Sequence, residues 1–223
     1  MFPVITIDGP SGVGKSTLSR ALARYLNWNL LDSGAIYRVL SLAQLKHYMN
    51  IKSENELIRL ASQLKIDFKF TDNKLFVYFE NSDVTPIIRT EQIASYASIL
   101  ASNQNIRLAL LKIQHNFRVA PGLIADGRDM GTVVFPDAKV KFFLYASTRK
   151  CVLRRIQQLQ NKGINVNFKE IMYNIKRRDY RDYNRIIAPL KPANDAIVID
   201  SSYLSITEVI KTAIVYINKI LLF

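Results

Sequence analysis

One segment near the start of the chain constrains the fold more than any other. Residues 9–16 read Gly-Pro-Ser-Gly-Val-Gly-Lys-Ser, which fits the pattern G-x-x-x-x-G-K-[ST]. The β-branched run 4–7 precedes this segment, and apolar residues spaced near 3.6 follow it between Ser16 and Leu26. Because strand, glycine loop and helix occur in register, a phosphate-binding loop is favoured over a glycine-rich turn with a surface lysine.

This loop has the residue types that triphosphate binding requires. Glycines at 9, 12 and 14 let backbone N–H groups turn inward, and the helix that follows presents the positive end of its dipole. Lys15 is expected to reach the β and γ phosphates, and the Ser16 hydroxyl is expected to ligate Mg²⁺. The predicted ATP-binding residues are Gly9, Pro10, Ser11, Gly12, Val13, Gly14, Lys15, Ser16 and Thr17.

Four further apolar runs predict strands at 29–32, 123–125, 140–145 and 196–200. Strands that alternate with helical patterns predict an α/β fold with a five-stranded, largely parallel sheet flanked by helices. Such a sheet binds ligands beyond the carboxyl ends of its strands, which is where the polar motifs of this chain lie.

Two stretches interrupt this alternation. Residues 68–70 and 75–79 flank the Asx-rich segment 71–74, which predicts a β-hairpin, and a third short strand is expected at 83–85. Residues 65–90 are therefore interpreted as a small antiparallel insert. The segment 160–168 joins two basic helices and is expected to move as a lid.

Composition narrows the ligand and the compartment. The chain has 223 residues and a net charge of +13, which attracts either nucleic acid or small phosphate esters. The phosphate-binding loop favours small phosphates, so no nucleic-acid partner is expected. The single cysteine, Cys151, is expected to be a buried thiol. We see no signal peptide and no apolar run long enough to cross a membrane, so we expect a cytoplasmic monomer.

Polar motifs follow the predicted strands. Residues 32–38 follow the second strand, and residues 126–132 follow the third. Arg178, Asp182 and Arg185 have spacings of four and three, which places them on one face of a helix. That face suits an anionic sugar ester, although a solvated helix of ion pairs has the same spacing.

At 9–17, 32–38, 126–134 and 178–190 the chain strongly resembles the bacterial cytidylate kinases, and the similarity extends through essentially the whole chain. The resemblance implies Mg²⁺-dependent phosphorylation of CMP and dCMP by ATP. It also implies a core of residues 1–35, 120–150 and 186–223, an NMP-binding region of about 36–119, and a lid of about 151–185.

The resemblance also assigns roles to individual residues. The monophosphate pocket and the phosphoryl path are matched by Ser33, Arg38, Arg128 and Arg185. The sugar contacts are matched by Tyr37, Arg178 and Asp182. The cytosine-reading residues are matched by Ser98, Arg107 and Asp129. The lid arginines near ATP are matched by Arg154 and Arg155. The residues expected to take part in catalysis are Lys15, Arg128, Arg185 and Arg154.

Hydrogen bonding explains how cytosine could be selected. Asp129 can accept from the exocyclic amine, and Arg107 can donate to N3, whereas uracil reverses both groups.

Asp126 either holds Mg²⁺ through water or makes a structural hydrogen bond to the helix after the loop. Two other functions stay open: a kinase for another monophosphate such as UMP, and a nucleotide-binding protein that contacts nucleic acid. No role is assigned to His47 or His115.

Overall fold

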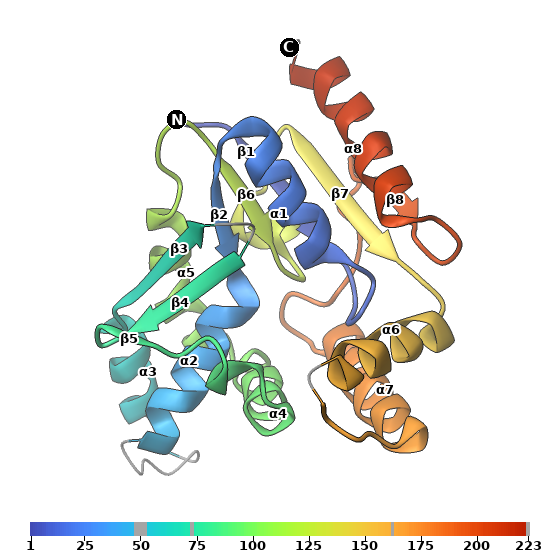
Figure 1. Cartoon of the computed structure of the whole chain (residues 1–223). Helices are drawn as coiled ribbons and strands as arrows, with labels where there is room; N and C mark the ends of the chain where they lie inside the picture. Colours follow the sequence, from blue (N-terminus) through green and yellow to red (C-terminus); the bar gives the residue numbers. More distant parts are fainter. Residues whose placement is uncertain (47–52, 72–73, 162, 222–223) are drawn as a thin grey trace.

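A computed structural model describes residues 1–46, 53–71, 74–161 and 163–221 (Figure 1). The central sheet contains β1 (Val4–Asp8), β2 (Asn29–Asp32), β6 (Leu123–Asp126), β7 (Val140–Tyr145) and β8 (Ile197–Asp200). All pairings are parallel, and the strand order is β2-β6-β1-β7-β8. The prediction of a five-stranded parallel sheet is confirmed.

Both faces of this sheet are apolar and covered. On β1, Val4 packs into one hydrophobic cluster, whereas Ile5 and Ile7 pack into the other. Two helices, α1 (Lys15–Leu26) and α8 (Ile206–Leu221), cover the face of Ile5 and Ile7 (Figure 1). On the opposite face, α2 (Ser33–Lys46) contacts β6, and α3 (Glu54–Ser62), α4 (Glu91–Leu100) and α5 (Gln104–Asn116) join the same hydrophobic cluster. Because both faces are covered, a ligand is expected to bind beyond the carboxyl ends of the strands.

The insert is a separate antiparallel sheet of β3 (Ile66–Thr71), β4 (Lys74–Phe79) and β5 (Ser82–Asp83). The register runs from Ile66 opposite Phe79 to Thr71 opposite Lys74, which confirms the predicted hairpin. The third strand is shorter and begins one residue earlier than expected. Residues 72 and 73 of the predicted turn lie outside the described residues. A 3₁₀ turn, η1 (Ile87–Arg89), leads from the insert into α4.

The proposed lid region has a small core of its own. Its two helices, α6 (Thr148–Gln160) and α7 (Phe168–Asn184), pack through Val152, Leu159, Ile171 and Ile175. Residue 162 of the joining segment 160–168 lies outside the described residues. A π-helical turn, η2 (Met130–Val134), follows β6 and lies against β1.

Several smaller expectations can be compared with the structure. Cys151 is buried, as expected. Arg185 is not on the helix of Arg178, because α7 ends at Asn184 and the backbone of Arg185 is extended. His115 has a partner that the sequence did not reveal, since its Nε2 lies 2.8 Å from the Val134 carbonyl oxygen. His47 lies outside the described residues. Over the described ranges, no helix combines the length and apolar character needed to cross a membrane.

Candidate active site

A cavity of about 800 Å³ opens at the carboxyl ends of the parallel strands. The phosphate-binding loop, the start of α2, parts of α4 and α5, and the inner faces of α6 and α7 line it. Every residue predicted to bind ATP, substrate or metal lines this cavity, except Gly9 and Pro10. Motifs that are more than 100 residues apart in the sequence therefore meet at one place.

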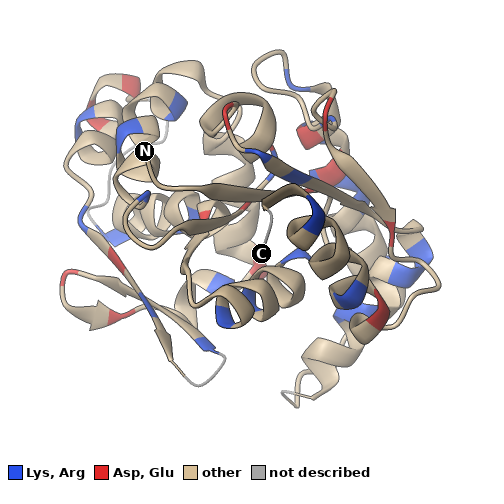
Figure 2. Ribbon diagram, turned by 90° about the horizontal axis from the view of Figure 1, so that it is seen from above, with Lys and Arg blue, Asp and Glu red and all other residues tan. Residues whose placement is uncertain are grey.

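The cavity is strongly cationic. Basic residues are spread over the helices and strands of the whole fold (Figure 2), but ten of them line this cavity beside only four carboxylates. The cationic side chains are Lys15, Arg20, Arg38, Arg89, Arg107, Arg128, Arg154, Arg155, Arg178 and Arg185. The carboxylates are Asp32, Asp126, Asp129 and Asp182. Such an excess favours ligands with several negative charges.

Two glycines give the phosphate-binding loop its shape. Gly9 has a φ of +145°, and a Cβ there would collide with the Leu144 carbonyl oxygen on β7. Gly14 has a φ of +104° and forms the N-cap of α1. The loop therefore turns back tightly against the sheet and delivers the N–H groups of the α1 terminus to the cavity.

Lys15 is buried at this helix terminus, and its Nζ donates to the Pro10 carbonyl oxygen at 2.8 Å. Burial and, to a smaller extent, the nearby Arg128 guanidinium lower the pKa of Lys15 to about 8, although Asp126 opposes the change. An anionic phosphate would restore the charged form, because opposite charge favours the ammonium ion.

Asp126 ends β6 and faces the same helix. Its Oδ2 accepts from the Ser16 hydroxyl at 2.8 Å and from the Ser19 hydroxyl at 3.3 Å. Burial raises the pKa of Asp126, and Lys15 acts in the opposite direction. The structural hydrogen bond considered from the sequence is thus present. A pair of hard oxygen atoms beside Lys15 also fits Mg²⁺, which takes few protein oxygens and completes its shell with water and phosphate.

A second carboxylate, Asp8, fixes the segment that follows β6. Its two oxygens accept from the backbone N–H groups of Met130 and Gly131, both at 2.8 Å. Burial raises the pKa of Asp8 to about 7, although these two hydrogen bonds favour the carboxylate. Arg128 and Asp129 immediately precede the two anchored residues, so Asp8 sets their position.

Asp129 lies between two arginines. It forms a buried ion pair with Arg107, and its Oδ1 lies 3.5 Å from Nη2 of Arg185. Arg107 also donates to the Ala101 carbonyl oxygen at 3.2 Å. Ser98 lines the same cavity, and its hydroxyl is buried without a hydrogen-bond partner among the described residues. A polar ligand would satisfy that hydroxyl.

The neighbouring wall comes from α2. Ser33 donates its hydroxyl to Gln114 of α5 at 2.8 Å, and Arg38 donates to the Ile88 carbonyl oxygen at 3.0 Å. Burial lowers the pKa of Arg38 to about 10 and raises that of Tyr37 to about 12. Tyr37 lies below the guanidinium of Arg107, 5.9 Å from the ring centre. These side chains are held by the fold rather than by solvent.

Arg128 connects the two halves of the cavity. Its Nε donates to Asp182 of α7 at 2.8 Å, and its Nη2 donates to the Ser11 hydroxyl in the phosphate-binding loop at 3.0 Å. Burial disfavours the charged form of Arg128, but Asp182 more than offsets this effect, so the pKa is raised. Arg128 therefore keeps its charge between the phosphate-binding loop and α7.

The arginines of α6 make different contacts. Arg154 donates to the Ser201 carbonyl oxygen at 2.6 Å and to the Val13 carbonyl oxygen at 3.3 Å, so it lies against the phosphate-binding loop. Arg155 instead donates to Glu91 at the start of α4. The two neighbours thus face the donor side and the α4 side of the cavity respectively.

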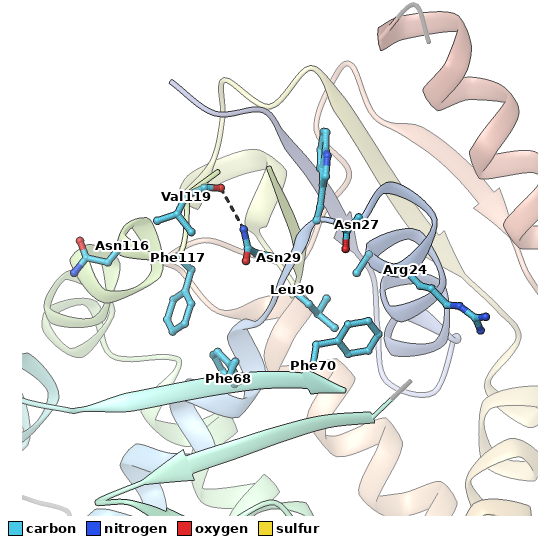
Figure 3. Close-up of a pocket in the computed structure, with 11 residues that line it drawn as sticks. Arg24, Asn27, Asn29, Leu30, Phe68, Phe70, Asn116, Phe117 and Val119 are labelled. Carbon is cyan, nitrogen blue, oxygen red and sulfur yellow. Dashed lines mark hydrogen bonds between the residues drawn. The ribbon is translucent and has the colours of Figure 1, made fainter. Parts of the chain in front are cut away.

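A second cavity, of about 680 Å³, lies beside the C-terminal end of α1 and contains none of the predicted site residues (Figure 3). Phe68, Phe70, Leu30 and Phe117 provide much of its wall. Asn29 is occupied structurally, because its Nδ2 donates to the carbonyl oxygens of residues 119, 120 and 122. Since neither the phosphate-binding loop nor any other predicted site residue lines it, this cavity is not the candidate active site.

Sequence reasoning missed several residues that shape the site. Asp8, Gln114 and Glu91 hold predicted site residues in place, and Asp179 accepts from the Ser11 backbone N–H at 3.0 Å. For Asp8 there was a signal, because a carboxylate at the end of a buried strand requires buried partners. The other three occur on helices, where polar residues are common and their partners cannot be inferred from spacing.

Comparison with known proteins gives consistent results. A family model described as cytidylate kinase matches residues 5–219. A cytidylate kinase of Proteus mirabilis is 56% identical over 220 residues, which are 99% of this chain and 98% of that protein. A cytidylate kinase of Serratia proteamaculans is 57% identical over 219 residues, with 98% and 96% covered. The solved structure of an uncharacterized Eubacterium ventriosum protein has a TM-score of 0.53 at 14% identity, covers 98% of this chain and 99% of its own, and supports the fold alone.

Proposed function

The chain belongs to the cytidylate kinase family, and on that premise we propose how this cavity phosphorylates CMP and dCMP with ATP. One observation carries the assignment of the acceptor. The buried pair of Arg107 and Asp129 lines the same cavity as the phosphate-binding loop and the Ser98 hydroxyl, which has no hydrogen-bond partner among the described residues. This set of groups presents a donor, an acceptor and a hydroxyl to one base edge.

These groups are complementary to cytosine. Asp129 accepts from the exocyclic amine, Arg107 donates to N3, and Ser98 supplies a further hydrogen bond. Uracil would place its O4 against the carboxylate and its N3–H against the guanidinium. Because the site is buried, the unmatched groups could not turn to water, and uracil would be disfavoured.

The rest of the acceptor binds along the same wall. We assign the CMP phosphate to Ser33, Arg38, Arg128 and Arg185, and the sugar to Tyr37, Arg178 and Asp182. Support comes from burial and from free donors. Among the described residues, Nε of Arg178 is buried and has no hydrogen-bond partner. The ion pair of Asp182 with Arg128 keeps a sugar-binding acceptor next to a phosphate-binding donor.

Transfer is direct and in line. A phosphate oxygen of CMP forms a bond to the γ-phosphorus of ATP, and the bond from that phosphorus to the β–γ bridging oxygen breaks, giving CDP and ADP. The attacking oxygen is already anionic near neutral pH, so no general base is needed. The chain's contribution is to align the two nucleotides and to offset charge through Lys15, Arg128, Arg185 and Arg154.

Bound Mg²⁺ would neutralise charge on the β and γ phosphates, and Ser16 and Asp126 are the residues that would hold it, Asp126 through water. Both oxygens lie beside Lys15 at the α1 terminus. The proposed lid, residues 151–185, would exclude water, which is the competing acceptor.

We further propose a cytoplasmic monomer that binds ATP and CMP and no nucleic acid. The buried single thiol suits a reducing compartment, and the cationic side chains of the cavity are accounted for by two phosphorylated ligands.

Coupled ADP release with each nucleoside monophosphate in turn tests the function. ADP is expected with CMP and dCMP, and much more slowly with UMP. Equal rates with AMP would contradict the base assignment. Turnover of ATP that is unaffected by every monophosphate would contradict the kinase assignment as a whole.

A further inference from the structure

Glu91 joins three elements at the edge of the active-site cavity. It is the first residue of α4, where the helix dipole favours a carboxylate. Its Oε1 accepts from Nε and Nη2 of Arg155 on α6, at 3.2 and 2.6 Å. Its Oε2 lies 3.3 Å from Nη2 of Arg178 on α7. A single carboxylate thus binds one arginine from each helix of the proposed lid.

The surroundings keep Glu91 charged. Burial disfavours its ionised form, but Arg178 and Arg155 together hold the pKa of Glu91 below its usual range. The side chains of Glu91, Arg155 and Arg178 are 32%, 25% and 14% exposed, so water screens these pairs only in part. A second contact joins α7 to α4 close to this cluster, because Arg177 of α7 donates to the Ser95 hydroxyl of α4 at 3.0 Å.

Arg178 does not use its whole guanidinium on Glu91. Its Nη2 faces the carboxylate, while its Nε is buried without a hydrogen-bond partner in the described part of the chain. Both Arg155 and Arg178 line the cavity. Glu91 and a ligand can therefore hold Arg178 at the same time, from different nitrogens. If Glu91 had to release Arg178 before a ligand could bind, it would instead occupy the same donor groups that the ligand needs.

We infer that Glu91 is a positioning residue, which fixes Arg178 for the acceptor nucleotide and ties the α4 wall of the acceptor site to the lid through Arg155. The inference rests on the proposed function, since it assumes that Arg178 contacts CMP. Glu91 itself touches neither substrate. Because Glu91 already holds the Arg178 side chain in place, Arg178 loses less conformational entropy when CMP binds, and CMP binds more tightly.

Replacing Glu91 by Gln keeps the shape and removes the charge. We expect Glu91→Gln to raise the KM for CMP about tenfold, the loss typical of one charge-assisted hydrogen bond, while kcat changes less than threefold. Glu91→Asp should recover part of the affinity, because the charge remains but the reach is shorter. Glu56→Gln is the matched control, since Glu56 is exposed on α3, lies outside the cavity, and should leave KM and kcat unchanged.

The outcomes separate the possible roles. A lower KM for CMP in Glu91→Gln would mean that Glu91 competes for the arginines and would overturn the inference. An unchanged KM with a lower melting temperature would reduce Glu91 to a structural residue and would overturn it too. The wild-type enzyme is assayed alongside, and if it releases no ADP with CMP, the proposed function fails independently of Glu91.

Discussion

At the scale of single residues, Lys15 combines burial, positive charge and a weak partner. Its ammonium group donates to a carbonyl oxygen rather than to a carboxylate, and burial lowers its pKa to about 8. Keeping such a charge in place lowers the stability of the folded protein. We therefore propose that this side chain serves to neutralise phosphate charge rather than to stabilise the fold.

We expect Lys15→Ala to lower kcat by at least about 100-fold, because a buried charge at the transferring phosphoryl group is removed. The melting temperature near pH 7 should be unchanged or higher. The folded state binds fewer protons than the unfolded state between about pH 8 and 10.5. The buried charge of Lys15 therefore lowers the free energy of unfolding by its full amount below pH 8, and this destabilisation decreases as the pH rises toward 10.5. Turnover and melting curves at both ends of that window check this, and an unchanged kcat would contradict the loop assignment.

Asp129 tests how the base is read. In Asp129→Asn the amide can still accept from the cytosine amine, and it can turn to donate to O4 of uracil. The variant also loses its charge between Arg107 and Arg185, so both substrates should react more slowly. That common loss cancels in the ratio of kcat/KM for CMP to that for UMP, which should move toward UMP about tenfold or more.

Steady-state kinetics with both monophosphates measures this ratio. Arg107 limits the change, because it still donates toward the N3–H of uracil. Equal loss for CMP and UMP would show that Asp129 only supports its neighbours, and the cytosine assignment would lose its main residue.

Local motifs predicted which residues meet in the cavity, but not the residues that hold them. The loop 9–17 has a recognisable spacing, and its strand and helix confirm its context. Asp8 and Gln114 were missed because their partners, Met130 and Ser33, are 122 and 81 residues away. A pair at that separation leaves no periodic signal in one sequence.

At the scale of helices and strands, apolar runs located all five core strands. The three central strands, β6, β1 and β7, are buried along nearly their whole length and must be continuously apolar, whereas the edge strands β2 and β8 carry shorter buried runs. The order of the strands was not predictable, since β1 and β6 have similar composition and either could lie at an edge. The third insert strand was misplaced because only two residues, Ser82 and Asp83, pair with β4. The end of α7 was missed because arginine is a good helix former and nothing at Arg185 signals a stop.

Asp8 connects two elements, β1 and the π-helical turn η2, and its effect should depend on pH. A raised pKa means that the folded state binds more protons than the unfolded state between about pH 4 and 7. The contribution of protonated Asp8 to the free energy of unfolding is therefore fully present below pH 4 and is lost as the pH rises through 7. In Asp8→Asn this group no longer titrates, and all other groups still do.

We therefore expect the free energy of unfolding of the wild type to fall relative to Asp8→Asn from pH 4 to pH 7.5. A shift of about three pKa units corresponds to roughly 4 kcal/mol, which is an upper bound because water penetration reduces it. Denaturant titrations of both proteins at pH 4.5, 6 and 7.5 give the difference. A constant difference would mean that the two backbone hydrogen bonds hold the pKa of Asp8 near its ordinary value.

At the scale of the whole molecule, the cavity is enclosed by parts that have separate cores. The sheet is packed on both faces, whereas α6 and α7 share a small cluster of their own. The insert reaches the cavity through Val77 of β4 and through Ile88, and α6 reaches it through Gln157 and Asn161. The sequence indicated an insert and a lid, but their placement around one cavity depends on tertiary packing that no local pattern records.

This division predicts a separate response to each substrate. CMP should slow hydrogen exchange in β3 and β4, because the insert borders the acceptor wall formed by α2. An ATP analogue should slow exchange at the segment 163–168, because it follows α6, whose Arg154 donates to the Val13 carbonyl oxygen of the phosphate-binding loop. Each ligand alone should protect its own segment about tenfold or more, and the two together should protect both.

The measurement must distinguish local closure from general stabilisation. Any ligand that binds only the folded state slows every amide that exchanges through global unfolding, by the factor 1 + [L]/Kd. Asp137 and Lys139 are exposed just before β7, at the opposite end of the sheet from the cavity, and their amides should exchange locally at the same rate with and without ligands. If the insert and the segment 163–168 slow only as much as amides in the core strands do, closure is not required to explain the protection. If CMP protects the segment 163–168 and not the insert, the acceptor lies on the other side of the cavity from the one proposed.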